Sequence, residues 1–142
     1  MRPPSIVMFE RLFLASMVLS VLAFIVGYDT LTEQLANEPG LSELGLGAGF
    51  LTGIVAVSVA IYLLLWFLIA RKASSVAKWI LIVLLALSLF SLPAIFAGVL
   101  DLIAILNIAV YALELAAVVH LFRADAVAWF RGEWNTDPTT FD

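Results

Sequence analysis

Four apolar stretches, each about 20 residues or longer, constrain this chain more than any other feature. They occupy residues 8–28, 47–70, 76–100 and 102–122. A helix needs about 20 mostly apolar residues to cross the hydrocarbon core of a bilayer. In lipid, the backbone amides of each stretch must be hydrogen-bonded within it, so we expect helices. The sequence therefore predicts an all-α integral membrane protein, a four-helix bundle in up-down-up-down order.

Composition also indicates a lipid environment. The chain has 142 residues, 64% of them hydrophobic and 13% charged, whereas soluble domains are roughly half apolar and a quarter charged. This length accommodates a single transmembrane domain, residues 1–142, with an outer loop at 29–46 and a tail at 123–142. We expect the lipid bilayer to be the main partner and expect no nucleic-acid partner.

The basic residues predict the orientation. All seven flank one set of ends of the apolar stretches: Arg2, Arg11, Arg71, Lys72, Lys78, Arg123 and Arg131. Loop 29–46 has four acidic residues and no basic one. Basic segments stay on the cytoplasmic side of a membrane, so we expect both termini and the loop after residue 70 to be cytoplasmic.

The sequence has no set of residues typical of an enzyme. Cysteine is absent, which excludes thiolate metal sites and a cysteine nucleophile. The single histidine, His120, falls at the rim of the fourth stretch, where no nucleophile accompanies it. We therefore expect no catalytic residues, no metal site and no cofactor.

Glu114 is the exception in an otherwise apolar stretch. An ionised carboxylate near the bilayer centre costs about 2.5–3.5 kcal/mol. Asn107, Tyr111 and Glu114 are spaced i, i+4, i+7 and share one helix face, and Ser58 and Tyr62 form an i, i+4 pair in the second stretch. No basic residue lies at this depth, so we expect Glu114 to be protonated and hydrogen-bonded to Tyr62, Tyr111 or Asn107.

Two interpretations of this intramembrane polar site remain open. In one, neutral Glu114 holds helices together by hydrogen bonding. In the other, Glu114 binds a proton or cation on a transport path. Convergence of the polar residues on a wet cavity would favour transport, and a dry hydrogen-bonded cluster would favour the structural role.

Small residues along the second stretch indicate a helix-packing face. Gly45, Gly49 and Gly53 recur every four residues, and Ala56 and Ala60 continue the row. Such a ridge lets another helix approach closely. The partner helix could belong to the same chain or to a second copy.

Pro93 interrupts the third stretch. Proline lacks an N–H and leaves a carbonyl without its helical partner, so we expect a kink there. Membrane helices tolerate such kinks, which predicts a static bend rather than a hinge.

Three segments resemble a group of uncharacterised small four-span bacterial inner-membrane proteins. They are RPPSIVMFERLFL, LLLWFLIARKASSVAKWIL and LFRADAVAWFRG. The resemblance implies a multi-pass protein of the bacterial inner (plasma) membrane, and it implies no activity.

We therefore expect a structural or accessory role, exerted by helix packing in a homo-oligomer or in a larger membrane complex. The alternative is an oligomeric proton- or cation-linked transporter or channel that uses Glu114. In the tail, ADAVAWFRGEW predicts a short interfacial helix with Ala126, Trp129 and Phe130 turned toward lipid.

Overall fold

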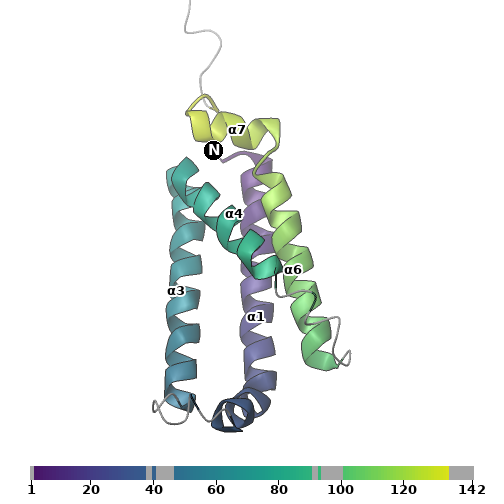
Figure 1. Cartoon of the computed structure of the whole chain (residues 1–142). Helices are drawn as coiled ribbons and strands as arrows, with labels where there is room; N and C mark the ends of the chain where they lie inside the picture. The colour runs from purple at the N-terminus through teal and green to yellow at the C-terminus, as the bar shows by residue number, and fades with distance from the viewer. Residues whose placement is uncertain (1, 38–39, 41–46, 91–92, 94–100, 135–142) are drawn as a thin grey trace, which may run out of the picture.

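The computed structural model describes residues 2–37, 40, 47–90, 93 and 101–134. Across these residues it has five helices: α1 (Pro4–Asn37), α3 (Ala48–Lys72), α4 (Ser75–Leu89), α6 (Leu102–His120) and α7 (Ala124–Arg131) (Figure 1). Helices α1, α3 and α6 are long and apolar enough to cross a membrane, whereas α4 is described over only 15 residues. The predicted all-α class is confirmed.

The helix ends differ from the predicted stretches in two places. Helix α1 continues to Asn37, into the segment predicted as outer loop, because no helix breaker precedes the Pro39-Gly40 pair. Helix α4 is described to Leu89, so most of the remaining predicted third stretch lies outside the described residues. Pro93 itself is described and exposed, but residues on both sides of it are not.

Local signals explain where several helices begin. Pro4 is the first residue of α1, a position where the missing N–H costs nothing. The side chain of Ser74 accepts a hydrogen bond from the Ala77 amide at the start of α4, and Asp101 does the same for Ala104 in α6. The turn between α3 and α4 depends on Ala73, whose φ of 50° is left-handed.

The helices alternate in direction along the chain (Figure 1). Helix α1 packs most extensively along α6, whereas α3 contacts α1 and α4 over shorter lengths. The buried residues of α3 are Leu65, Ile69 and Ala70, all in its last turns. Helix α3 is therefore anchored at one end.

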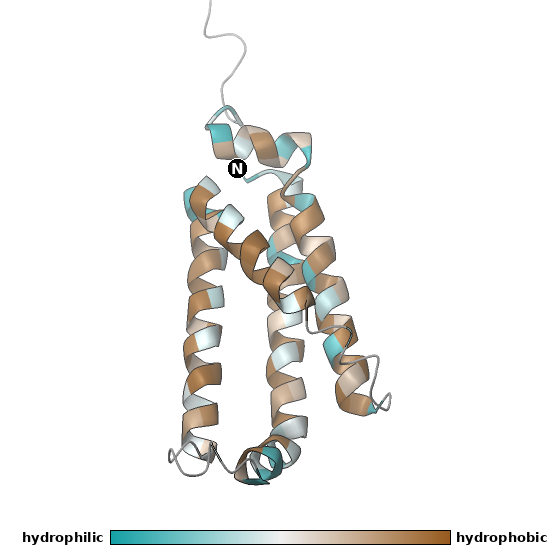
Figure 2. Ribbon diagram, viewed as in Figure 1, coloured by the Kyte–Doolittle hydropathy of each residue, from teal (hydrophilic) through white to brown (hydrophobic). Residues whose placement is uncertain are grey.

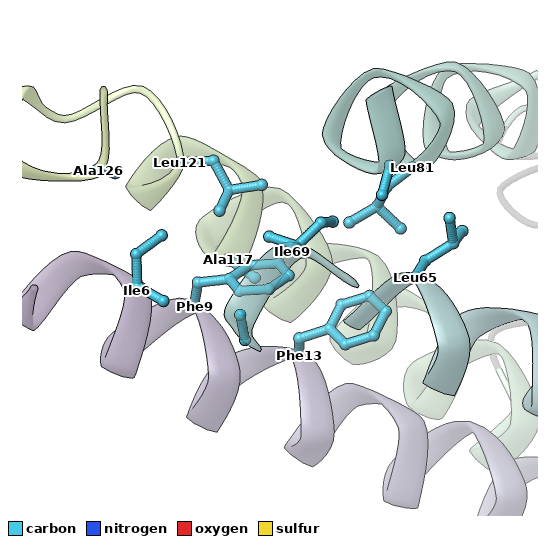
Figure 3. Packing of buried hydrophobic residues seen from close by; sticks show 11 residues of the cluster. Ile6, Phe9, Phe13, Leu65, Ile69, Leu81, Ala117, Leu121 and Ala126 are labelled. Carbon is cyan, nitrogen blue, oxygen red and sulfur yellow. The ribbon is translucent and has the colours of Figure 1, made fainter. Parts of the chain in front are cut away.

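That end holds the main hydrophobic core (Figure 3). All five described helices contribute to it: Ile6, Phe9, Phe13, Leu65, Ile69, Ala70, Ala77, Leu81, Ala117, Leu121 and Ala126. The rings of Phe9 and Phe13 stack with centroids 5.4 Å apart. Away from this core many residues of the long helices are apolar (Figure 2), and many large apolar side chains are exposed. Soluble monomers rarely expose so much apolar surface.

Helix α7 does not have the predicted environment. Ala126 is fully buried in the core, and Trp129 and Phe130 pack against it. The prediction that these three residues face lipid is wrong. The three residues do share one helix face. Helix α7 lies across the end of the other helices (Figure 1), and this face packs on them instead of facing lipid.

Candidate functional site

A cavity of about 970 Å³ lies between α1, α3 and α6, beside the end of α4. Its apolar wall includes Met17, Val21, Phe24, Val55, Val59, Ile103 and Val110. Its polar residues are Ser20, Thr30, Gln34, Ser58, Tyr62, Ser88, Asp101, Asn107, Tyr111 and Glu114. A mostly apolar cavity of this size with a few polar groups is typical of small-molecule sites.

The fold brings together all five residues of the predicted polar site. Ser58 and Tyr62 come from α3, and Asn107, Tyr111 and Glu114 come from α6. Their helical spacing places each set on one face, and the two faces meet at the cavity. Among them, Tyr111 donates a hydrogen bond from its hydroxyl to the Ser88 carbonyl oxygen at 3.3 Å.

Glu114 has no hydrogen-bond or ion-pair partner among the residues that the structure describes. The hydrogen bonds expected from Tyr62, Tyr111 and Asn107 are absent there. The half-buried carboxylate instead lines the cavity. Within the described ranges no group of three or more His, Cys, Asp or Glu residues could hold a metal ion.

The core closes one end of this cavity. Tyr62 lines the cavity and also packs on Phe13, with ring centroids 6.2 Å apart. Beyond Phe13 lie the buried residues at the α7 end. In the other direction the lining reaches Gln34, near the end of α1, and Asp101, the residue that caps α6. The cavity thus runs from the core toward the ends of α1 and α6 that lie away from α7.

The predicted small-residue ridge on α3 is exposed. Gly49, Gly53, Ala56 and Ala60 are all exposed, and a Cβ atom placed on either glycine would meet nothing within 4 Å. Gly45 lies outside the described residues. No described helix of the same chain packs on the two glycines.

The close glycine contact lies elsewhere. A Cβ on the buried Gly27 of α1 would come within 3.3 Å of Ile103 Cδ1 on α6. Gly27 therefore allows the close approach of the two helices that share the longest contact. No sequence pattern marks Gly27, because it stands alone, without a second glycine at four-residue spacing.

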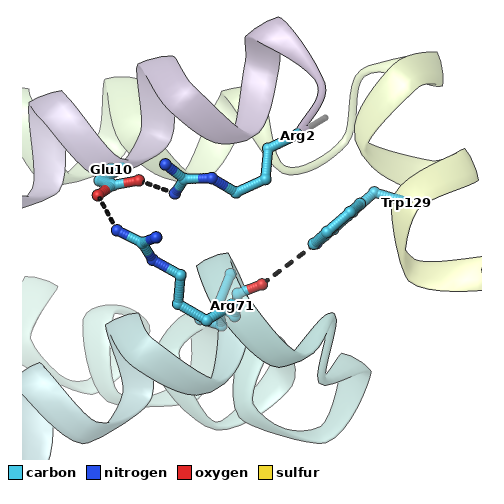
Figure 4. A network of polar contacts seen from close by, with 5 residues as sticks. Arg2, Glu10, Arg71 and Trp129 are labelled. Atoms are coloured by element: carbon cyan, nitrogen blue, oxygen red, sulfur yellow. Dashed lines mark hydrogen bonds and ion pairs between the residues drawn. The ribbon is translucent and has the colours of Figure 1, made fainter. Parts of the chain in front are cut away.

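An ion-pair network lies at the α7 end (Figure 4). Glu10 of α1 accepts hydrogen bonds from both Arg2 and Arg71, and the Arg71 contact measures 3.2 Å. The Trp129 indole N–H donates to the Ile69 carbonyl oxygen at 3.4 Å. These contacts join the start of α1, the end of α3 and helix α7.

A second polar contact joins α7 to α1. Asp125 accepts hydrogen bonds from the Ser5 backbone N–H at 2.9 Å and from the Ser5 hydroxyl at 2.7 Å. Burial raises the pKa of Asp125, but hydrogen bonds from Ser5 and from the Ala126 and Asp125 amides lower it more, so the pKa lies below its usual value. The carboxylate caps the N-terminus of α1 from a distant part of the sequence.

Lys78 is the buried basic residue of this end, at 9% exposure. Its ammonium lies 4.6 Å from the centre of the Phe130 ring and 5.3 Å from that of Phe122. Aromatic faces attract a cation, so these rings stabilise Lys78 where it is partly desolvated. Phe130 thus ties α7 to the start of α4.

Together these features define, over the residues that the structure describes, an all-helical protein whose three long apolar helices surround a mostly apolar cavity with a few polar groups. Within this class the chain belongs to the family of the vesicle-trafficking protein SEC22a, C-terminal domain, whose model matches residues 1–100. That match covers α1, α3 and α4, and it ends before α6 and Glu114. Comparison with curated proteins and with solved structures gave no match.

This family membership overturns the bacterial resemblance. The match is to a domain of a eukaryotic vesicle-trafficking protein, so the predicted bacterial group and the predicted bacterial inner membrane are both wrong. The three segments behind that prediction combine apolar residues with basic residues near the expected membrane boundary. Multi-pass proteins of any cell share that pattern, because the bilayer and the positive-inside rule impose it.

Proposed function

We propose that this protein is a multi-pass membrane protein with a structural or accessory role in vesicle trafficking, acting by helix packing with itself or within a larger membrane complex. The family to which the chain belongs supports the proposed part in vesicle trafficking. The observation that carries the role is the bare face of α3, where Gly49, Gly53, Ala56 and Ala60 are exposed. In lipid, small residues are where helices associate most closely.

The proposed topology has four spans with both termini in the cytosol. The seven basic residues and the positive-inside rule support it. At about 1.5 Å per residue, the 15 described residues of α4 extend for less than the roughly 30 Å of a bilayer core. The third span in this proposal therefore also needs residues beyond Leu89.

Native mass spectrometry tests the accessory role. The complex is extracted gently from its own membrane, and we expect a homo-oligomer or a stable complex with a foreign subunit. Gly53→Leu and Ala56→Leu place bulk on the ridge and should weaken that assembly. Ala86→Leu is the matched control, because Ala86 is exposed on α4. A bare monomer, or equal assembly in all three variants, would contradict the proposal.

Transport is a second candidate, and the cavity favours it. The polar residues of α3 and α6 converge on one space, as a transport site requires. Conduction through one chain would also need an opening in the core beyond Phe13 and Tyr62. Proton or cation flux in proteoliposomes, compared between wild type and Glu114→Gln, tests this candidate, and equal flux would exclude Glu114 as the transport site.

A further inference from the structure

The carboxyl group of Glu114 lines a cavity without a basic partner among the described residues. It lines a cavity of about 970 Å³ together with the phenol rings of Tyr62 and Tyr111, and no described basic residue pairs with it. An unpaired carboxylate away from bulk water gains strongly from a cationic hydrogen-bond donor. A cationic ligand would favour the ionised form of Glu114 and supply the partner that the described chain does not.

The remaining lining restricts what can carry this charge. Met17, Phe24 and Val59 are among the apolar residues of the wall, so the ligand needs an apolar body. A bare metal ion fits poorly, because no described cluster of three His, Cys, Asp or Glu residues is present. An anion would be repelled by Glu114. Tyrosine rings attract an ammonium group through their π faces.

The cavity is long enough to take a ligand that has a charged head and an apolar body. The core beyond Phe13 closes one end, and the lining extends from Glu114 to Gln34 at the other. A molecule can therefore place a charged head beside Glu114 and extend its apolar part along the walls.

We propose that this cavity binds a cationic amphiphile, a membrane-soluble molecule with one protonated amine on an apolar body, and that Glu114 pairs with the amine. The site is independent of the accessory role proposed above. It would remain if the protein were a monomer, and the assembly would remain if the site were lost.

Binding of dodecylamine tests this proposal. Full-length protein is placed in nanodiscs of neutral phosphatidylcholine, and radiolabelled dodecylamine is titrated, with protein-free nanodiscs as blank. We expect saturable binding that dodecanol, which lacks the charge, does not compete away. Glu114→Gln should weaken binding by about tenfold or more, because it removes one partner of a desolvated charge pair. Saturable binding that dodecanol displaces equally well would overturn the proposal, as would no binding.

Two further variants make the result decisive. Glu33→Gln removes the same charge from an exposed position outside the cavity and should bind like wild type. Ser20→Trp keeps Glu114 but fills the cavity from an exposed position on α1, and it should also abolish binding. Equal loss in Glu33→Gln, or full binding in Ser20→Trp, would refute the site even if Glu114→Gln failed to fold. Native mass spectrometry of the same samples reports assembly separately.

Discussion

At the scale of single residues, the contact between Ser5 and Asp125 shows how α7 is held on the start of α1. Two hydrogen bonds connect residues 120 positions apart, and they position α7 on the start of α1. Sequence patterns do not predict such a contact, because Asp125 also suits the first turn of its own helix. The structure assigns it a second role as a cap for α1.

This cap predicts a pH dependence of stability. The pKa of folded Asp125 is below its usual value, so the folded state binds the proton more weakly than the unfolded state, whose pKa is about 3.9. The contribution of Asp125 to stability is therefore complete above about pH 5 and is lost as pH falls through the folded pKa. Asp125→Asn should cost about 1 kcal/mol at pH 7. Thermal unfolding followed by tryptophan fluorescence should show the wild-type advantage shrinking below pH 4, and a constant advantage would contradict this account.

Ala73 offers a stabilising substitution. Its φ of 50° is a left-handed conformation that costs an alanine about 1–2 kcal/mol and costs glycine almost nothing. Glycine loses more backbone entropy on folding, roughly 0.4–1 kcal/mol, so Ala73→Gly should stabilise the protein by about 0.5 kcal/mol. Ala86→Gly, in the helical part of α4, is the control and should destabilise by about 1 kcal/mol. An unfolding temperature of Ala73→Gly below that of the wild type would contradict this prediction.

At the scale of helices, sequence reasoning succeeded where hydrophobic length decides the outcome. Helices α3 and α6 begin and end close to the predicted stretches, because long apolar runs in lipid have few alternatives to a helix. The polar face of α6 was predictable from the spacing of Asn107, Tyr111 and Glu114. The contacts between helices were harder to predict from the sequence. Ala126 and Trp129 form an apolar face that suits lipid or another helix equally well, and only tertiary structure distinguishes the two.

The contact between α1 and α6 gives a prediction at this scale. Gly27→Ala brings a Cβ within 3.3 Å of Ile103 Cδ1, the flexible end of a side chain that can move. The higher helix propensity of alanine offsets this crowding, so stability should change by less than about 1 kcal/mol. Gly27→Leu should destabilise by about 1–3 kcal/mol, because the added atoms separate the helices.

The control for this prediction is Gly49→Leu. A Cβ there meets nothing within 4 Å, so the monomer should keep its stability to within about 0.5 kcal/mol. Reversible unfolding in mixed micelles, at protein concentrations that keep the chain monomeric, measures all three variants. Equal effects of leucine at positions 27 and 49 would show that Gly27 is not at a close helix contact.

At the scale of the whole molecule, the basic residues and the hydrophobic core lie at the same end. The basic residues of all five described helices and their flanks gather at the α7 end with the hydrophobic core. Asp29 and Glu33 lie near the other end of α1, and Asp101 precedes α6. Helix α1 has 34 residues and is about 50 Å long, more than a bilayer core of roughly 30 Å requires. In a membrane it must tilt or extend beyond the lipid.

Single cysteines can establish the topology, because the natural chain has none. In sealed vesicles with the cytosolic face outward, an impermeant maleimide should label Ser74→Cys, between α3 and α4. It should label Asn37→Cys, at the end of α1, only after permeabilisation. Leu102→Cys, exposed at the start of α6, decides the number of spans. If the chain from Ser75 to Asp101 crosses the bilayer, position 102 is protected like position 37. Labelling of Leu102→Cys in intact vesicles would instead place both ends of that segment in the cytosol, and the four-span proposal would then be wrong although the three long helices remained.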